Sequence, residues 1–148
     1  MRYETQQDLD REKKAIEIFV GRFNGRYHKL APDDIDYRIL DENGRVLAYA
    51  EVKGRNRMIK DAFPLPIAAK KVTKLCAKRM NPTIIWSCDD GLLYGKVQQL
   101  KGEVRWGGRK PRENSPYNND SELMMYFPKQ KDIKYIKFYE ENLEVKQE

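Results

Sequence analysis

Two acidic residues and one lysine, separated by a predicted tight turn, have the composition of a site for phosphate chemistry. Asp36 precedes the dipeptide Asn43-Gly44, and Glu51 and Lys53 follow it. Carboxylate oxygens are the ligands that Mg²⁺ and Mn²⁺ prefer, and a lysine stabilises negative charge that develops on a neighbouring group. The three side chains can act together only if the chain folds back on itself between them.

The dipeptide Asn43-Gly44 predicts that fold-back, because Asn-Gly is typical of two-residue β-hairpin loops with positive φ angles. With these residues as the loop, the strands run over about 34–41 and 45–53, and Asp36 lies directly opposite Glu51. The other pairs on that face are Arg38 with Tyr49, Leu40 with Leu47 and Asp34 with Lys53; those on the opposite, apolar face are Ile39 with Ala48, Tyr37 with Ala50 and Ile35 with Val52. Like charges side by side on a sheet repel each other, so a divalent cation is the expected occupant. A shift of the register would bring Asp34 into this position instead.

The pattern resembles the signature of the PD-(D/E)xK, or restriction-endonuclease-like, nuclease superfamily. That signature is an acidic residue on one strand and a D/E-x-K triplet on the next, here Asp36 and Glu51-Val52-Lys53. The literal Pro-Asp pair, Pro32-Asp33, precedes the predicted strand and lies off the row of Glu51. The resemblance covers residues 8 to 96 and implies an α/β fold whose restriction-endonuclease-like core is a mixed central β-sheet flanked by helices.

The resemblance also implies the roles of the site residues. Asp36, Glu51 and the backbone carbonyl of Val52 would hold Mg²⁺ or Mn²⁺, and Glu12 from the first helix would lean toward the metal. A salt bridge or a plain surface charge is the alternative for Glu12. Lys53 would stabilise the developing charge and help to position or deprotonate the attacking water. The expected activity is hydrolysis of DNA, as an endonuclease, leaving a 5′-phosphate and a 3′-hydroxyl.

Hydrophobic spacing predicts one domain, residues 1–148, with a helix at each side of the hairpin. Leu9, Ile16, Phe19 and Phe23 recur at helical spacing and share their face with Glu12. The expected elements are a helix over 8–22, a helix over 66–80, strands over 83–88, 92–96 and 123–127, an irregular or mobile basic loop over 101–122, a short helix or turn over 133–136 and a polar tail from 140.

Basic side chains around the predicted site indicate a polyanionic partner, most simply DNA. The candidates for nucleic-acid binding are Arg55, Arg57, Lys70, Lys74, Arg105, Trp106, Arg109 and Lys110. Lys70 and Lys74 lie one helical turn apart without interspersed acids, and the segment around Trp106 combines cations with an aromatic ring suited to base stacking. The alternative for each group is an ordinary solvated surface or loop.

Composition excludes several other classes of protein. The chain has 148 residues and a net charge of +6, a basic excess that alone indicates nucleic acid only weakly. There is no apolar run of membrane-spanning length, no apolar leader and no Walker-type loop, so we expect a cytoplasmic protein without its own NTPase motor. Cys76 and Cys88 are expected to be reduced core thiols, and His28 lacks partners for a hydrolytic triad.

Two other function classes stay open at this point. One is a non-catalytic nucleic-acid-binding module that keeps a nuclease fold, and the other is an enzyme for a small phosphorylated substrate. The complete Asp, Glu and Lys set favours the nuclease over the first, and the basic loops favour it over the second. A homodimer and an origin in a phage or mobile element are both compatible with so compact a chain.

Overall fold

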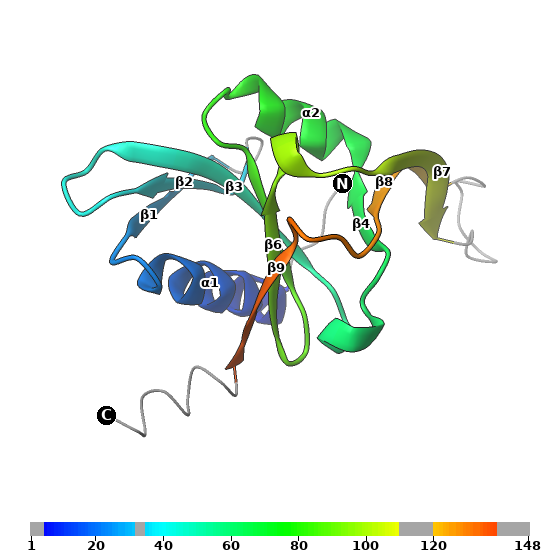
Figure 1. Cartoon of the computed structure of the whole chain (residues 1–148), viewed down its shortest axis with the longest axis horizontal. Coiled ribbons are helices and arrows are strands. Elements are labelled where there is room, and N and C mark those ends of the chain that lie inside the picture. The colour runs from blue at the N-terminus through cyan, green and yellow to red at the C-terminus, as the bar shows by residue number, and fades with distance from the viewer. Residues whose placement is uncertain (1–4, 32–34, 110–119, 139–148) are drawn as a thin grey trace.

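The computed structural model describes residues 5–31, 35–109 and 120–138, and it shows a mixed central sheet with one helix on each face (Figure 1). The elements are α1 (Gln6–Gly21), β1 (Arg26–Lys29), β2 (Tyr37–Leu40), β3 (Val46–Gly54), the 3₁₀ turn η1 (Ile59–Asp61), β4 (Leu65–Ala68), α2 (Ala69–Ala77), β5 (Thr83–Ser87), β6 (Gly91–Lys96), the 3₁₀ turn η2 (Val97–Gln99), β7 (Glu103–Arg109), β8 (Asp120–Phe127) and β9 (Lys134–Lys137). The predicted fold class is confirmed. Among the described residues no helix is long and apolar enough to cross a membrane.

The central sheet has the strand order β1-β2-β3-β5-β6-β9. β3 and β5 pair in parallel, whereas the neighbouring pairs are antiparallel. All five residues of β5 are buried, as expected for a strand covered on both faces. The centre of the sheet is therefore the rigid part of the fold, and β3, which carries the E-x-K triplet, lies beside it.

Two hydrophobic clusters cover the two faces of this sheet. Ala15, Ile16 and Val20 of α1 pack against one face, on which Val52 and Ile85 also lie. Val72 and Leu75 of α2 pack on the other face together with Leu65, Trp86 and Phe127. Successive residues of a strand face opposite sides of the sheet. Because Val52 faces α1, its neighbours Glu51 and Lys53 lie on the α2 side of β3.

Helix α1 begins at Gln6, slightly before the predicted start at residue 8, and a capping box fixes this start. The Thr5 side chain accepts a hydrogen bond from the Asp8 N–H at 3.1 Å, and the Asp8 carboxylate accepts one from the Thr5 N–H at 3.2 Å. This capping box is a common helix start and contributes about 1 kcal/mol. The helix ends at Gly21, so the prediction that Phe23 belongs to its buried stripe is wrong: Phe23 is 43% exposed.

The hairpin between β2 and β3 reaches the predicted register by a different loop. Gly44 has φ 82°, but the N–H of Gly44 bonds to the carbonyl of Asp41, and the N–H of Asp41 to the carbonyl of Arg45. The loop thus has three residues, 42–44, rather than two. This changes the predicted pair Leu40–Leu47 to Leu40–Val46, and a bulge next to it restores the pairs Tyr37–Ala50, Arg38–Tyr49 and Ile39–Ala48.

The start of β2 departs from the predicted alternation. Ile35 is buried in the cluster on the α2 side, whereas Tyr37 and Ile39 belong to the cluster on the α1 side. The expectation that Ile35 continues their face opposite Val52 is therefore wrong, because the chain bends at Asp36. The predicted pair of Asp34 with Lys53 lies outside the described residues.

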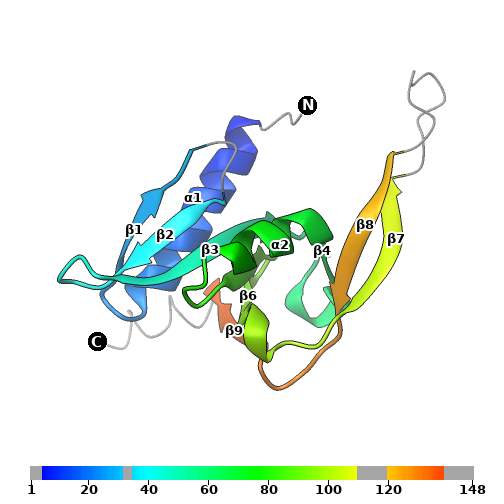
Figure 2. The same cartoon turned by 90° about the horizontal axis from the view of Figure 1, so that it is seen from above.

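A second sheet corrects the prediction of an irregular excursion over 101–122. β7 pairs with β8 from Glu103–Tyr126 to Arg109–Asp120, and β8 pairs with β4. Figure 2 shows this pair of strands as an arm at one side of the molecule. The glycines suggested a loop, but a Cβ atom at Gly107 would collide with the Tyr126 hydroxyl. Glycine there serves strand packing. Residues 110–119 lie outside the described residues.

Three further elements differ from the prediction. Residues 134–137 form the edge strand β9 instead of a helix or turn, because they pair with β6. β1 has a polar, exposed sequence without a strand pattern and forms by pairing with β2. α2 covers only 69–77, since the preceding residues pair with β8 as β4. The predicted polar tail from 140 lies outside the described residues.

Candidate active site

Asp36 and Glu51 hold each other in place at the open end of the β2–β3 hairpin. The N–H of Asp36 donates to Glu51 Oε2 at 2.9 Å, and the N–H of Val52 donates to Asp36 Oδ2 at 2.8 Å. The Asp36 carboxylate thus takes the place of the backbone acceptor that would continue the β2–β3 ladder. Both side chains are buried, with exposures of 8% for Asp36 and 3% for Glu51. The two predicted metal ligands are neighbours.

The charge around Asp36 is dominated by other acids. Burial, followed by the charges of Glu51 and Glu12, raises the pKa of Asp36 to about 7, against the opposing effects of the hydrogen bond from Val52 and the charge of Lys29. Buried carboxylates repel each other when no cation lies between them. An added cation between Asp36 and Glu51 would therefore relieve the repulsion between these two carboxylates.

Glu12 reaches the same region from α1. It is 8% exposed, lies one turn before Ala15 and Ile16 on the inward side, and forms an ion pair with Lys29 Nζ at 2.7 Å. Burial and the neighbouring Glu12 raise the pKa of the Tyr37 hydroxyl, which hydrogen-bonds to Glu12. Glu12 is thus both the inward-facing acid expected from the sequence and a member of a salt bridge, the alternative that the sequence left open.

Two lysines approach Glu51 from different elements. Lys71 of α2 places its Nζ 3.4 Å from Glu51 Oε1, with 23% of its side chain exposed. Lys53 lies two residues beyond Glu51 on β3 and lines the same pocket of about 330 Å³, which Lys70, Lys71, Ala68 and Glu122 also line. The pocket is therefore lined by both acidic and basic side chains and has room for a ligand. The sequence analysis noted Lys71 only as the neighbour of Lys70.

The donor atoms at and beside the pocket fit a hard divalent cation. Asp36 and Glu51 supply carboxylate oxygens, and the carbonyl of Val52 lies between Glu51 and Lys53 along β3. Such ligands suit Mg²⁺ and Mn²⁺. Within residues 5–31, 35–109 and 120–138, no group of three His, Cys, Asp or Glu side chains is arranged to hold a metal ion. Two carboxylates and a carbonyl would leave the remaining positions to water and substrate, as is usual for Mg²⁺.

Arg11 of α1 holds the strand ends next to the pocket, a role that the sequence analysis did not foresee. Its guanidinium donates to the carbonyl of Arg55 at 3.1 Å and to the carbonyl of Ser87, and it also contacts the Asn56 side chain. It lies 3.6 Å from Asp89 Oδ1. One side chain thus ties α1 to the ends of β3 and β5, directly after Lys53. An arginine on a helix gives no sequence signal for such contacts.

The basic residues predicted to bind nucleic acid have different surroundings. Arg55 is half-buried and donates to the carbonyls of Ala62 at 3.0 Å and Pro64 at 3.5 Å, so it supports the loop before β4. Arg57 is exposed after β3. Lys70 has 74% of its side chain exposed and lies 3.7 Å from Glu122 Oε2, which supplies the acid that the helix sequence itself lacks.

The other predicted nucleic-acid contacts lie on α2 and on the β7–β8 arm. Lys74 is an exposed residue of α2. Arg105 places its guanidinium 4.4 Å from the centre of the Tyr126 ring, and Trp106 is 75% exposed. Arg109 is the last residue of β7, and Lys110 lies outside the described residues. The side chains of Arg105 and Trp106 are therefore accessible to a large partner.

Comparison with known proteins gives one match. A family model described as "Phage putative PDDEXK endonuclease" matches residues 1–134. No curated protein and no solved structure matches the chain. The match covers most of the sequence, including both strands of the hairpin and the β7–β8 arm, and it confirms the resemblance to the PD-(D/E)xK superfamily. The chain belongs to this phage PDDEXK endonuclease family.

Proposed function

We propose that the protein is a metal-dependent endonuclease that hydrolyses phosphodiester bonds in DNA. The observation that carries the proposal is the buried pair of Asp36 and Glu51, each fixed by a backbone N–H, with Glu51 lining the same pocket as Lys53 and Lys71. A protein rarely buries two carboxylates side by side without a cation or a proton to offset their charge. The family membership supports a nuclease at the coarse level.

Asp36, Glu51 and the carbonyl of Val52 would hold Mg²⁺ or Mn²⁺, and Glu12 could reach it through a water. A cation bound there would screen the phosphate charge and orient the attacking water. The protein's own contribution is to fix these oxygens in advance. The hydrogen bonds from the Asp36 and Val52 N–H groups do so without mobile side-chain partners.

The two lysines supply the positive charge that the reaction needs. Lys53, at the wall of the pocket, would contact the phosphate and stabilise the charge that develops during attack. Lys71 contacts Glu51, and it would turn toward the substrate's phosphate when metal and substrate enter. A phosphodiester entering the pocket would thus contact the ammonium groups of Lys53 and Lys71 and approach the carboxylate of Glu51.

The alternative function is a nucleic-acid-binding module without catalysis. The ion pair between Lys71 and Glu51 is the observation in its favour, because a lysine in that position could replace a metal ion. Against it, Lys71 pairs with Glu51 and Lys29 pairs with Glu12, and neither of these ion pairs includes Asp36. Burial and the charges of Glu51 and Glu12 raise the pKa of Asp36, as expected for a carboxylate that a bound cation would stabilise.

A cleavage assay separates the two functions. The purified protein would be incubated with supercoiled, nicked, linear and branched DNA and with RNA, in Mg²⁺, in Mn²⁺ and in EDTA. We expect cleavage of DNA that requires the metal and is abolished in Asp36→Asn and Glu51→Gln, with conversion of supercoiled circles showing endonuclease action. Binding without cleavage of any of these substrates would favour the binding module.

A further inference from the structure

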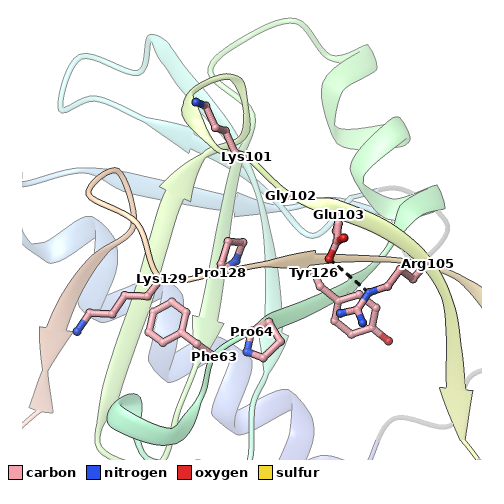
Figure 3. Close-up of a pocket in the computed structure, with 9 residues that line it drawn as sticks. All are labelled: Phe63, Pro64, Lys101, Gly102, Glu103, Arg105, Tyr126, Pro128 and Lys129. Atoms are coloured by element: carbon pink, nitrogen blue, oxygen red, sulfur yellow. Dashed lines mark ion pairs between the residues drawn. The ribbon is translucent and has the colours of Figure 1, made fainter.

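A second pocket lies on the small sheet formed by β4, β8 and β7. It has a volume of about 550 Å³ and is lined by Phe63, Pro64, Lys101, Gly102, Glu103, Arg105, Tyr126, Pro128 and Lys129 (Figure 3). This volume is within the usual range of about 300–1,000 Å³ for sites that take small organic groups. None of these residues belongs to the candidate active site.

The lining combines flat apolar groups with cations. The rings of Phe63 and Pro64 lie beside each other, with Pro128 above them and Tyr126 and Arg105 to their right in the view of Figure 3. The Arg105 guanidinium stacks on the Tyr126 ring, with 4.4 Å between its central carbon and the ring centre. Lys101 and Lys129 extend outward from the rim (Figure 3), and Glu103 is the one acid of the lining. Glu103 lies 3.7 Å from the Arg105 guanidinium, so the three cations exceed the one acid by two, which favours an anionic ligand with a planar, apolar part.

The pocket is a built feature, because its rim is held by hydrogen bonds. The Gln130 side chain accepts from the N–H of Lys101 at 2.9 Å and donates to the carbonyls of Lys101 and Pro128, each at 2.9 Å. Gly102 is required for the close approach, because a Cβ atom there would lie 2.8 Å from the Phe127 ring. The segments that carry Lys101 and Lys129 are therefore fixed relative to each other.

One face of β8 connects this pocket with the candidate active site. Alternate residues of a strand lie on the same face, so Tyr126, Met124 and Glu122 share one side of β8. Tyr126 lines the second pocket, and Glu122 lines the active-site pocket. Four residues of strand span roughly 14 Å, which corresponds to about four nucleotides of a stacked strand. The Tyr126 hydroxyl lies over Gly107, which pairs with Glu122, so the ring itself points along this path.

We propose that this pocket binds an unpaired nucleotide of the substrate strand, with its base on the Tyr126, Phe63 and Pro64 surfaces and its flanking phosphates at Arg105, Lys101 and Lys129. The inference rests on the proposed nuclease function and specifies its substrate as DNA with a single-stranded segment next to the cleaved bond. A base inside a duplex is stacked on both faces, and only an unpaired base can enter such a pocket.

The test measures binding rather than cleavage. Fluorescence anisotropy in EDTA would compare a labelled single-stranded 12-mer with its duplex, for the wild type, Tyr126→Leu, Tyr126→Phe and Arg105→Gln. Lys134→Gln, which removes one exposed charge on β9, is the matched control. Thermal melting would confirm that each variant is folded. Since Arg105 has 54% of its side chain exposed, Arg105→Gln tests the idea even if Tyr126→Leu does not fold.

We expect Tyr126→Leu to weaken single-strand binding roughly tenfold, as is usual for loss of one base–aromatic stack, with less than about twofold change for the duplex. Tyr126→Phe should retain wild-type binding, and Arg105→Gln should weaken the single strand more than Lys134→Gln does. Equal weakening of both DNA forms, or no weakening, would overturn the inference. If the wild type cleaves DNA but these variants bind single strands normally, the proposed nuclease activity is supported and the proposed nucleotide pocket is wrong. If single-strand binding depends on Tyr126 but no DNA is cleaved, the pocket is supported and the proposed nuclease activity is wrong.

Discussion

Lys71 Nζ lies 3.4 Å from Glu51 Oε1, so the glutamate of the E-x-K triplet is in contact with a cation from a different element. Glu51 also accepts the N–H of Asp36, and its two oxygens are therefore both engaged. A divalent cation at this site would compete with Lys71 for Oε1. The helix lysine and the metal would thus be alternative partners of one carboxylate.

This competition predicts the effect of Lys71→Gln on metal binding. Loss of the ammonium group should raise Mn²⁺ affinity by up to about fivefold, the range expected for one partly exposed ion pair. Isothermal titration calorimetry at low ionic strength would measure it. Lys70→Gln is the control, because Lys70 pairs with Glu122 instead. A lower Mn²⁺ affinity in Lys71→Gln would show that Lys71 supports the metal-binding geometry rather than competing with it.

Metal affinity should also depend on pH through Asp36. The pKa of Asp36 is raised from the ordinary value of 3.8 to about 7, first of all by burial. Below about pH 7 the carboxyl group is protonated, and a metal ion must displace the proton, so affinity should fall about tenfold for each pH unit below that point and level off above it. Mn²⁺ titrations over this range would measure the slope. Asp36→Asn should bind weakly and with a smaller pH dependence; an equal slope in Asp36→Asn would assign the proton to another group.

The hairpin pairs next to the site have the register predicted from the sequence, although the loop does not. Two local departures from the predicted hairpin cancel each other. The loop has three residues instead of two, which alone would shift the pairing, and the bulge beside Leu40 shifts it back. The pairs Tyr37–Ala50 and Arg38–Tyr49 depend on the apolar alternation of both strands, a signal spread over many residues. Loop length depends instead on a few local hydrogen bonds, such as those accepted by the Asp41 side chain from Asn43 and Arg45.

Sequence patterns did not predict the contacts between elements that are distant in the sequence. Lys71 and Lys70 are adjacent on an exposed-looking helix, and only the position of α2 over β3 directs Lys71 toward Glu51. The strands β7 and β9 have too few apolar residues to be recognised from the sequence. Each forms because it pairs with one neighbouring strand, β8 for β7 and β6 for β9. Hydrophobic periodicity reports which side of an element is buried, but not which polar groups meet there.

Substitution of Arg11 tests whether its hydrogen bonds to the ends of β3 and β5 stabilise the fold next to the site. Replacing it with methionine should lower the free energy of unfolding by about 1–3 kcal/mol, because two charge-assisted hydrogen bonds to the carbonyls of Arg55 and Ser87 are lost, although each carbonyl keeps a backbone N–H donor. Urea denaturation would measure the change, with Lys13→Met on the exposed side of α1 as the control. Equal effects of the two substitutions would mean that the Arg11 contacts add no stability.

Lys53→Ala tests the role of the triplet's lysine. Cleavage should fall roughly 100- to 1,000-fold, the usual cost of removing one group that stabilises developing charge. DNA affinity in EDTA and the melting temperature should change little, because the Lys53 side chain is exposed. Single-turnover cleavage at saturating enzyme would separate the chemical step from binding. Lys60→Ala, an exposed lysine of η1, is the control; a loss of cleavage that saturating enzyme restores would assign Lys53 to substrate binding alone.

The basic side of α2 predicts how affinity for DNA depends on salt. Lys70 lines the active-site pocket, and Lys74 lies one turn farther along the exposed side of the helix. Each phosphate contact that is lost should reduce the slope of log K against log salt by about one unit. Lys70→Gln with Lys74→Gln should therefore lower the slope by up to about two and weaken all DNA sequences alike. Arg55 is left unchanged, because its bonds to the loop before β4 would confound the result.

The matched control for this experiment replaces Lys131 and Lys134, two exposed lysines at and just before β9. β9 is separated from β3 by β5 and β6, so these charges are equal in number but distant from the site. Their removal should lower the overall affinity slightly, through net charge, and leave the slope nearly unchanged. If both double variants reduce the slope equally, the contribution of α2 is only its share of the net charge, and the phosphate path would have to follow the β7–β8 arm instead.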